Sequence, residues 1–280
     1  MGRDVERLLD RRAEGAVGDL VLSLFPGIGL LDRAFEEEGF CVVRGPDLLW
    51  GGDVRRFHPP AGKFDGVIGG PPCQVFSRLR FVNPKAGQKH GNMIPEFERV
   101  VSEAMPTWFV MENVPEAPGP DLPGLYVVDS VLVRDVHVGG ETNRLRRFSF
   151  GTALFPRYSA ARKLQVECLA LWTPTPEPAV VATGGMRPVP VTMIRDGKGG
   201  HKRKKGALAN YGYNSKAAIA RMCELQGLPA DFLAETPFTL EAKGKAIGNG
   251  VPLPMGRAIA RAVKRALGIA EPFAPEGSAP

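Results

Sequence analysis

The sequence has 280 residues, of which 44% are hydrophobic, and a formal net charge of +6 at pH 7. A chain of this size can bury one large core, with room for a small second domain. It lacks an apolar run of the roughly 18 residues that a membrane helix needs, and its first residues, MGRDVERLLDRR, lack a signal core. Its four cysteines form no CxxC pair. These features predict a cytoplasmic protein without a membrane span, a metal site or a disulfide framework.

From residue 19 to about residue 150, short apolar runs alternate with helical stretches. The apolar runs are continuous and are closed by Gly, Pro or Asn, as in buried parallel strands. We expect such strands at 19–25, 64–70 and 107–113, helices at 30–38 and 95–105, and further strands at 126–138 and 143–151. This alternation predicts an α/β fold with a Rossmann-like, doubly wound and mostly parallel sheet.

The alternation stops after Phe155, where the chain becomes rich in Pro and Gly. We therefore expect a first domain at 1–152 and a smaller second domain at 153–240. An amphipathic helix at 256–267 is expected to return the chain to the first domain, as part of 241–270, before a disordered tail at 271–280. Within the second domain, the run RDGKGGHKRKK holds six Lys or Arg against one Asp. Such a run is either a solvated loop or a contact for a polyanion.

Glycines and carboxylates follow the first expected strands. Gly27 and Gly29 form a turn between a strand and a helix, the place where ligands bind in open α/β sheets. The third glycine of a dinucleotide fingerprint is missing, so a plain tight turn is the alternative. Asp47 follows the apolar run CVV at 41–43, which is taken as the second strand, and could bind ribose hydroxyls; Asp53 could accept from an adenine amino group. The alternative for both is a surface turn.

The stretch GGPPCQVFS places Cys73 on a stiff corner behind two glycines and two prolines. Such a corner suits a nucleophile, although a lone cysteine can also be a small buried hydrophobe. Glu112 closes the strand at 107–113, so both residues are expected at the same edge of the sheet. Arg144 and Arg146 are two positions apart on an expected strand and would therefore share a face. A surface pair of arginines is the alternative.

These motifs, in this order, resemble the DNA cytosine-5 methyltransferases across nearly the whole chain. LFPGIGLLDRAF looks like the family's cofactor motif, GGPPCQVFS its nucleophile motif and MENV its glutamate motif. TNRLRRFSFG is similar to the Gln-x-Arg-x-Arg motif, and IGNGVPLPMGRAIARA to the Gly-Asn-x-Val motif. ELQGLP resembles a segment that packs the recognition region, so the second domain would be a target-recognition domain.

The resemblance implies methyl transfer to carbon 5 of a cytosine in double-stranded DNA. The Cys73 thiolate would add to carbon 6 of the flipped-out base, Glu112 would bond ring nitrogen 3, and Arg146 with Arg144 would hold the base carbonyl. Contacts implied for the methyl donor, S-adenosyl-L-methionine, are Phe25, Gly27, Ile28, Gly29, Asp47, Asp53, Pro71, Asn249 and Val251. Contacts implied for DNA are Gln74, Ser77, Lys202, Arg203, Lys204 and Lys205. A monomer is expected.

Three positions depart from the family pattern. Thr142 stands where the glutamine of the arginine motif is expected, Leu30 replaces a glycine of the cofactor turn, and Asp47 replaces a glutamate. Two alternative functions stay open: a methyltransferase of the same mechanism that acts on tRNA, and a non-catalytic DNA-binding relative. The sequence specifies neither the recognised bases nor a restriction endonuclease partner.

Overall fold

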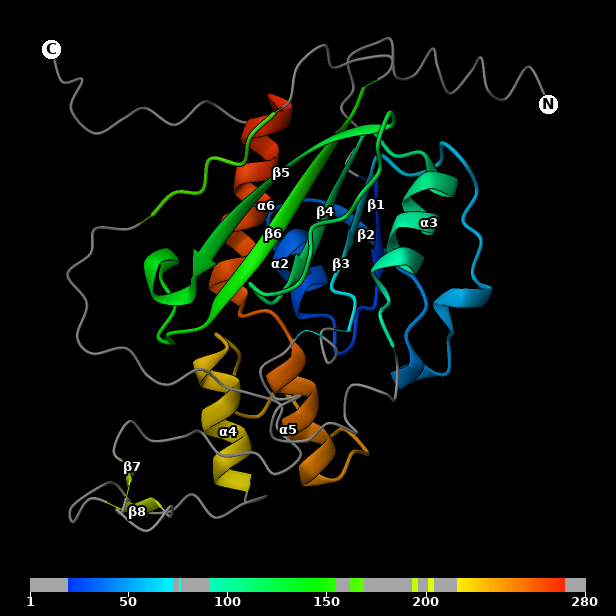
Figure 1. Ribbon diagram of the computed structural model, residues 1–280. Helices are drawn as coiled ribbons and strands as arrows, with labels where there is room; N and C mark the ends of the chain where they lie inside the picture. The colour runs from blue at the N-terminus through cyan, green and yellow to red at the C-terminus, as the bar shows by residue number, and fades with distance from the viewer. Residues whose placement is uncertain are drawn as a thin grey trace, which may run out of the picture. The chain divides into compact units, whose positions relative to one another are not determined.

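The computed structural model describes residues 20–72, 76, 91–154, 162–168 and 216–269, and the backbone of 193–195 and 201–203. Its main feature is a six-stranded sheet with the order β2-β1-β3-β4-β6-β5 (Figure 1). β1 pairs in parallel with β2 and with β3, and β3 with β4, whereas β6 pairs antiparallel to β4. The strands are β1 (Leu20–Leu24), β2 (Cys41–Arg44), β3 (Gly66–Gly69), β4 (Trp108–Asn113), β5 (Tyr126–Arg134) and β6 (Leu145–Ala153). The predicted α/β, Rossmann-like class is confirmed.

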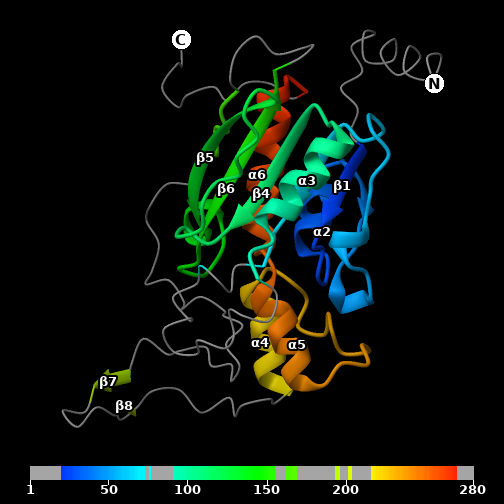
Figure 2. The ribbon, with the colours of Figure 1, turned by 45° about the vertical axis from the view of Figure 1, so that its right-hand side comes forward.

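Helices cover both faces of this sheet. Trp108 and Phe109 are consecutive in β4, so their side chains point to opposite faces. Trp108 stacks on Phe35 of α2 (Leu30–Glu37), with ring centroids 6.3 Å apart. Phe109 meets Phe97 of α3 (Ile94–Ala104) edge to face, at 5.8 Å between ring centroids. α3 therefore lies on one face and α2 on the other, as the two views show (Figures 1 and 2).

The face that α2 covers also receives the C-terminal helix α6 (Leu253–Leu267). Two ion pairs join these helices across more than 200 residues of sequence: Arg257 Nε lies 2.6 Å from Glu37 Oε2, and Arg261 Nη1 lies 2.7 Å from Glu38 Oε1. The predicted helix at 256–267 thus directly contacts the first part of the chain.

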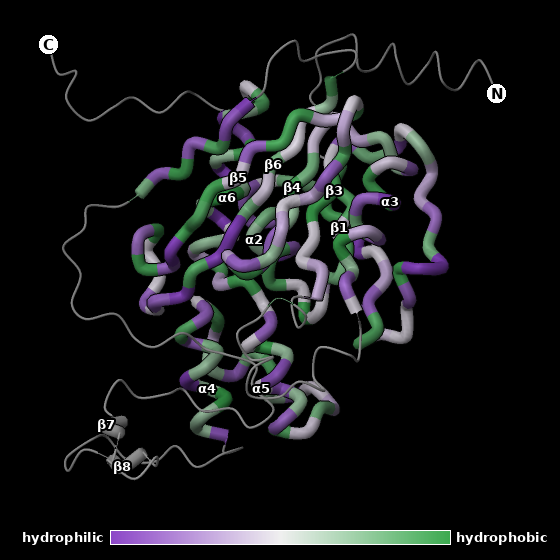
Figure 3. Tube along the Cα trace, in the orientation of Figure 1, coloured by the Kyte–Doolittle hydropathy of each residue, from purple (hydrophilic) through white to green (hydrophobic). Residues whose placement is uncertain are grey.

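The core forms where the apolar runs were expected. Every residue of β4 is buried, and in β1 only Leu20 is partly exposed, which agrees with the hydrophobic colour of β1 in Figure 3. The expected strand at 126–138 is shorter than predicted. β5 ends at Arg134, and Asp135–Val138 forms a 3-10 turn that closes at Gly139 with φ of 91°. The turn forms because the buried Asp135 carboxylate binds the chain that returns toward β6.

The chain divides into two compact units. Unit 1 takes the described residues within Met1–Val133, Leu145–Glu167 and Gly256–Pro280, and unit 2 takes those within Arg134–Arg144 and Cys168–Met255. These limits differ from the predicted ones, because the connection between β5 and β6 groups with unit 2 and the return to unit 1 comes at Gly256. Unit 2 contains α4 (Lys216–Leu225) and α5 (Leu240–Asn249), two helices that the sequence analysis did not assign.

The basic run, interpreted above as either a solvated loop or a contact for a polyanion, includes strand residues. The backbone of β7 (Met193–Arg195) pairs antiparallel with β8 (His201–Arg203), and Ile194 lies opposite Lys202 in the register. Two of the predicted DNA contacts, Lys202 and Arg203, are therefore strand residues. Lys204 and Lys205 lie outside the described residues.

Candidate active site

The glycine turn after β1 has an unusual backbone. Phe25, Gly27 and Gly29 all have positive φ, of 55°, 56° and 77°. Glycine adopts this region without strain, whereas Phe25 does so at a cost of the order of 1–3 kcal/mol. A Cβ atom on Gly27 would meet nothing within 4 Å, so the backbone there has open space beside it. A ligand can approach the main chain closely at this point.

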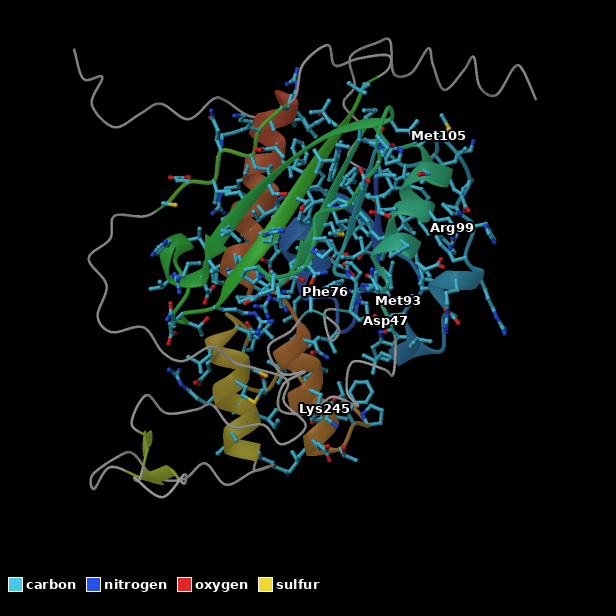
Figure 4. The ribbon with its side chains drawn as sticks, viewed as in Figure 1. Asp47, Phe76, Met93, Arg99, Met105 and Lys245 are labelled. Atoms are coloured by element: carbon cyan, nitrogen blue, oxygen red, sulfur yellow. The ribbon has the colours of Figure 1, made fainter. Side chains whose placement is uncertain are left out.

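The loop after β2 holds this turn in place. The Asp47 carboxylate, labelled in Figure 4, accepts from the Gly27 amide at 2.8 Å and from the Leu49 amide at 2.7 Å. The Trp50 indole Nε1 donates to the Gly27 carbonyl at 2.7 Å. Both main-chain groups of Gly27 are therefore fixed, the amide by the predicted cofactor contact Asp47 and the carbonyl by Trp50, of which 61% remains exposed. The sequence analysis missed Trp50, although a tryptophan in a turn next to the glycine motif was a usable signal.

Asp53 lies in the next loop with its carboxylate already engaged. It accepts from the Arg55 amide at 3.1 Å and from Arg55 Nη2 at 2.7 Å, and these bonds lower the pKa of Asp53. Arg99 of α3 supports the same loop by donating to the carbonyls of Val54 and Phe57 (Figure 4). A ligand amino group at Asp53 would compete with the Arg55 guanidinium.

The end of β4 contacts the turn that leads to Cys73. Gly69 pairs with Met111 in the parallel register, so Gly70 follows directly beside Glu112. A Cβ atom on Gly70 would lie 2.9 Å from Glu112 Oε2, which explains the need for glycine there. Asn113 Nδ2 donates to the Pro71 carbonyl at 3.3 Å. Cys73, Gln74 and Ser77 lie outside the described residues.

Glu112 forms an ion pair with Arg146 at the same strand end. Arg146 Nε lies 2.8 Å from Glu112 Oε1, and Arg146 Nη1 donates to the Leu145 carbonyl, also at 2.8 Å. Only 11% of the Glu112 side chain and 17% of the Arg146 side chain are exposed. The result is a shielded carboxylate with one oxygen on a guanidinium and the other against Gly70. Such a pair can donate to and accept from the polar edge of a planar ring.

Arg144 has different surroundings from Arg146. It lies one residue before β6 and belongs to unit 2. Its side chain is buried, and Nη2 donates to the Gly248 carbonyl at 3.0 Å. The expectation that the two arginines share a strand face is therefore wrong, because β6 begins only at Leu145.

The departure at Thr142 has a structural explanation. Its hydroxyl donates to Asp135 Oδ2 at 2.6 Å, and its amide donates to the same oxygen at 3.1 Å. Burial raises the pKa of Asp135, while the bonds from Thr142 act in the opposite direction. A glutamine would not fit this short contact, so the unusual residue is matched by Asp135 seven positions earlier.

The glycine turn has a buried acid beneath it. Asp32 of α2 accepts from the Ser23 hydroxyl at 2.5 Å, and Arg44 Nε lies 3.1 Å from its other oxygen. The same guanidinium lies against Gly29, where a Cβ atom would be 2.6 Å from Arg44 Nη2. Burial, opposed by Ser23 and Arg44, raises the pKa of Asp32 from 3.8 to about 6.

Asp32 should make the stability of the protein depend on pH. Because its pKa is raised on folding, the native state holds the proton more tightly, and stability is lost as the pH rises from about 4 to about 6. The shift corresponds to about 3 kcal/mol. Asp32→Asn cannot ionise, so the unfolding free energy of the wild type relative to the variant should fall across this window. Urea titrations at several pH values measure this, and a difference that does not change with pH would contradict the assignment.

The described residues include neither a membrane-crossing helix nor a group of three or more His, Cys, Asp or Glu side chains placed to hold a metal ion. Cys41 and Cys168 are exposed free thiols, and Cys223 is buried. Burial raises the pKa of Cys223 to about 11, so that thiol stays protonated.

Comparison with known proteins gives a family match that includes the ends of β3 and β4. The model of the C-5 cytosine-specific DNA methylase family matches residues 51–123, which include the turn at Gly70, Cys73 and Glu112. Over these residues, the chain is similar to the C-5 cytosine-specific DNA methylase family. The resemblance of the ordered motifs to this family is thereby confirmed.

Curated relatives match the chain over part of their length. Type II methyltransferase M.FnuDI of Fusobacterium nucleatum is 33% identical over a region that covers 34% of this chain and 32% of the relative. Type II methyltransferase M.AquIA of Picosynechococcus is 50% identical over 34% of this chain and 48% of the relative. The chain thus spans about a third to a half of the length of these two relatives.

Solved structures share the fold of this chain over a larger part of its length. One is a prophage-encoded E. coli protein described as a DNA modification methyltransferase. It has a TM-score of 0.58 at 18% identity and covers 89% of this chain and 99% of that one. Entamoeba histolytica methyltransferase EhMeth has a TM-score of 0.57 at 11% identity and covers 89% of this chain and 98% of its own. At these identities, the likeness concerns the fold.

Proposed function

We propose that the protein is a DNA (cytosine-5) methyltransferase that uses S-adenosyl-L-methionine. The observation that carries this proposal is the shielded Glu112–Arg146 pair, which lies against the Gly70–Pro71 turn three residues before Cys73. A nucleophilic thiol, a carboxylate and a guanidinium are the groups that addition to a cytosine ring requires. The matched family supplies the reaction type, and the described contacts supply its geometry at Glu112.

Glu112 and Arg146 have separate roles in this proposal. Carbon 5 of cytosine is too electron-poor to take a methyl group until a nucleophile has added to carbon 6. The Cys73 thiolate forms that bond, and Glu112 passes a proton to ring nitrogen 3, which neutralises the negative charge that develops on the ring. Arg146 holds Glu112 in place through Nε and presents the remainder of its guanidinium to the base carbonyl. After methyl transfer, the proton on carbon 5 leaves and the thiolate is expelled.

The glycine turn fits the proposed methyl donor. S-adenosyl-L-methionine supplies an electrophilic methyl group. The open space beside Gly27 admits a ligand to the main chain, and Phe25, Ile28, Gly29 and Pro71 complete the proposed contacts in unit 1. Asp47 fixes the turn through the Gly27 amide and can still accept from a ribose hydroxyl through its remaining lone pairs. Trp50, exposed beside Gly27, joins this proposed set.

Double-stranded DNA is the proposed substrate. The net charge of +6 favours a polyanion, and the basic run containing Lys202, Arg203, Lys204 and Lys205 would meet phosphates, with arginine also able to read guanine. Gln74 and Ser77 flank Cys73 in the sequence and would meet the flipped base or its neighbours. We further propose that the protein acts as a cytoplasmic monomer.

Base-resolution methylation sequencing tests the proposal. The protein is expressed in a host that lacks cytosine-5 methylation, and both DNA and tRNA are sequenced. New 5-methylcytosine in one short DNA sequence context is the expected result. Methylation of tRNA alone would replace DNA by RNA as the substrate. Unmodified DNA and tRNA, in cells that contain the folded protein, would contradict the proposed activity.

A further inference from the structure

The turn around Asn249 lies at the C-terminus of α5, where helix carbonyls lack partners within the helix. Two of these carbonyls, of the buried residues Ile247 and Gly248, accept hydrogen bonds from buried side chains. Asn249 itself is exposed. The main chain of this turn is therefore held by buried side chains, whereas Asn249 is exposed.

Gln226 is one of the two side chains that bind these carbonyls. It is 0% exposed and follows α4 in the ELQGLP stretch. Its amide Nε2 donates to the Ile247 carbonyl at 2.8 Å and to the Gly250 carbonyl at 3.3 Å. Its own main-chain carbonyl accepts from the Leu253 amide at 2.9 Å. One residue thus contacts the chain before and after Asn249.

Arg144 is the second. Its guanidinium donates to the Gly248 carbonyl at 3.0 Å, and a cation at a helix C-terminus also interacts favourably with the helix dipole. The connection between β5 and β6 fixes Arg144 in turn, because the Asp135 amide donates to the Arg144 carbonyl at 2.9 Å. Thr142 holds the Asp135 carboxylate on the same connection. The main chain of Arg144 is therefore held by this connection, while its side chain binds α5.

We propose that Gln226 and Arg144 are positioning residues that hold the Ile247–Val251 turn in the conformation in which Asn249 binds the cofactor. The proposal rests on the proposed function, since Asn249 and Val251 are cofactor contacts only within it. It also gives Arg144 a role different from contact with the base. Truncating Gln226 removes its bonds to the Ile247 and Gly250 carbonyls, so that of these bonds only the one from the Gly250 amide to the Ile247 carbonyl is kept. Truncating Arg144 removes its bond to the Gly248 carbonyl, and in either case the turn samples other conformations.

The test compares Gln226→Met with a surface control on α5, the helix whose Ile247 carbonyl Gln226 binds. Methionine has a similar length but no donor, whereas Lys245→Met removes an exposed pair of α5 with Glu241 (Figure 4). Isothermal titration calorimetry at 20 °C should show at least ~10-fold weaker binding of S-adenosyl-L-methionine by Gln226→Met and unchanged binding by Lys245→Met. Hydrogen exchange of the amides at 247–251 should become faster in the first variant only. At saturating cofactor and DNA, kcat should stay within about 3-fold of the wild type.

A double variant and a conservative variant test whether the loss of affinity comes from the turn at Asn249. Asn249→Ala should weaken binding by itself, and adding Gln226→Met should weaken it by less than about 2-fold more, because both changes affect the same contact. Arg144→Lys keeps a cation and should lose less affinity than Arg144→Met. A lower Tm with unchanged cofactor affinity in Gln226→Met and Arg144→Met would overturn the positioning role alone. Absence of binding by the wild type would instead overturn the proposed function.

Discussion

Replacing Cys73 with alanine is expected to abolish covalent capture of DNA that carries 5-fluorocytosine. With the wild type, the thiolate adds to carbon 6 and the methyl group is transferred to carbon 5. Fluorine at carbon 5 cannot leave as a proton, so the thiolate cannot be expelled and the protein stays attached to the DNA. Without the thiol, the first bond does not form. A denaturing gel with labelled DNA and S-adenosyl-L-methionine measures the adduct.

Other cysteines supply the controls for this experiment. Cys41 is an exposed free thiol on β2, so Cys41→Ala should give as much adduct as the wild type. Cys223 is a protonated, buried thiol with a pKa of about 11 and is not available as a nucleophile. An adduct formed by Cys73→Ala would assign the nucleophile to a different residue. Methylation by this variant at the wild-type rate would exclude covalent catalysis through Cys73.

Glu112→Gln should lower the methylation rate by about 10²–10⁴-fold, the usual contribution of a positioned acid or base. Glutamine keeps the size of the side chain and an oxygen that can accept from Arg146 Nε, so the pair should retain its geometry. It loses the negative charge and the ability to pass a proton to ring nitrogen 3. DNA affinity should change little. Single-turnover kinetics at saturating cofactor measure the rate, and a filter-binding titration measures the affinity.

A second glutamate in an ion pair provides a matched control. Glu241 pairs with Lys245 on the exposed face of α5, at 2.6 Å, and 52% of its side chain is exposed. Glu241→Gln removes a charge of the same kind and should leave the rate unchanged, because exposed pairs contribute little to stability. Near wild-type activity of Glu112→Gln would remove the carboxylate from the proposed mechanism. Equal losses in both variants would indicate a general effect of charge.

Much of the sheet could be predicted because its strands are continuous apolar runs closed by turn residues. The limits of β1, β3 and β4 differ from the expected ones by at most two residues, since strands buried on both faces leave this pattern in the sequence. The turn at Gly27 and Gly29 was equally visible, because positive φ favours glycine. The juxtaposition of the end of β3 with Glu112 followed from a general rule on parallel sheets and needed no knowledge of side-chain packing.

The remaining contacts depend on pairs that are distant in sequence. Arg144 reaches Gly248 across 104 residues, and no local pattern indicates a buried arginine on a helix carbonyl. Thr142 looked like a defect in a motif until Asp135 was found opposite it. The basic run has the composition of a loop, and only its pairing shows that part of it forms two strands. In each case, the deciding partner is tertiary and is not encoded by residue type or spacing.

The pairing of α6 with α2 has a consequence for biosynthesis. Glu37 and Glu38 emerge from the ribosome early, whereas Arg257 and Arg261 follow some 220 residues later. During most of translation, α6 has not been synthesised, so the face of α2 that it contacts is exposed. β4 is likewise synthesised before its partner strand β6. Non-local pairings of this kind slow folding and prolong the exposure of apolar surface. A nascent chain arrested before Gly256 should therefore be a preferred client of chaperones, and its release should coincide with synthesis of the last helix.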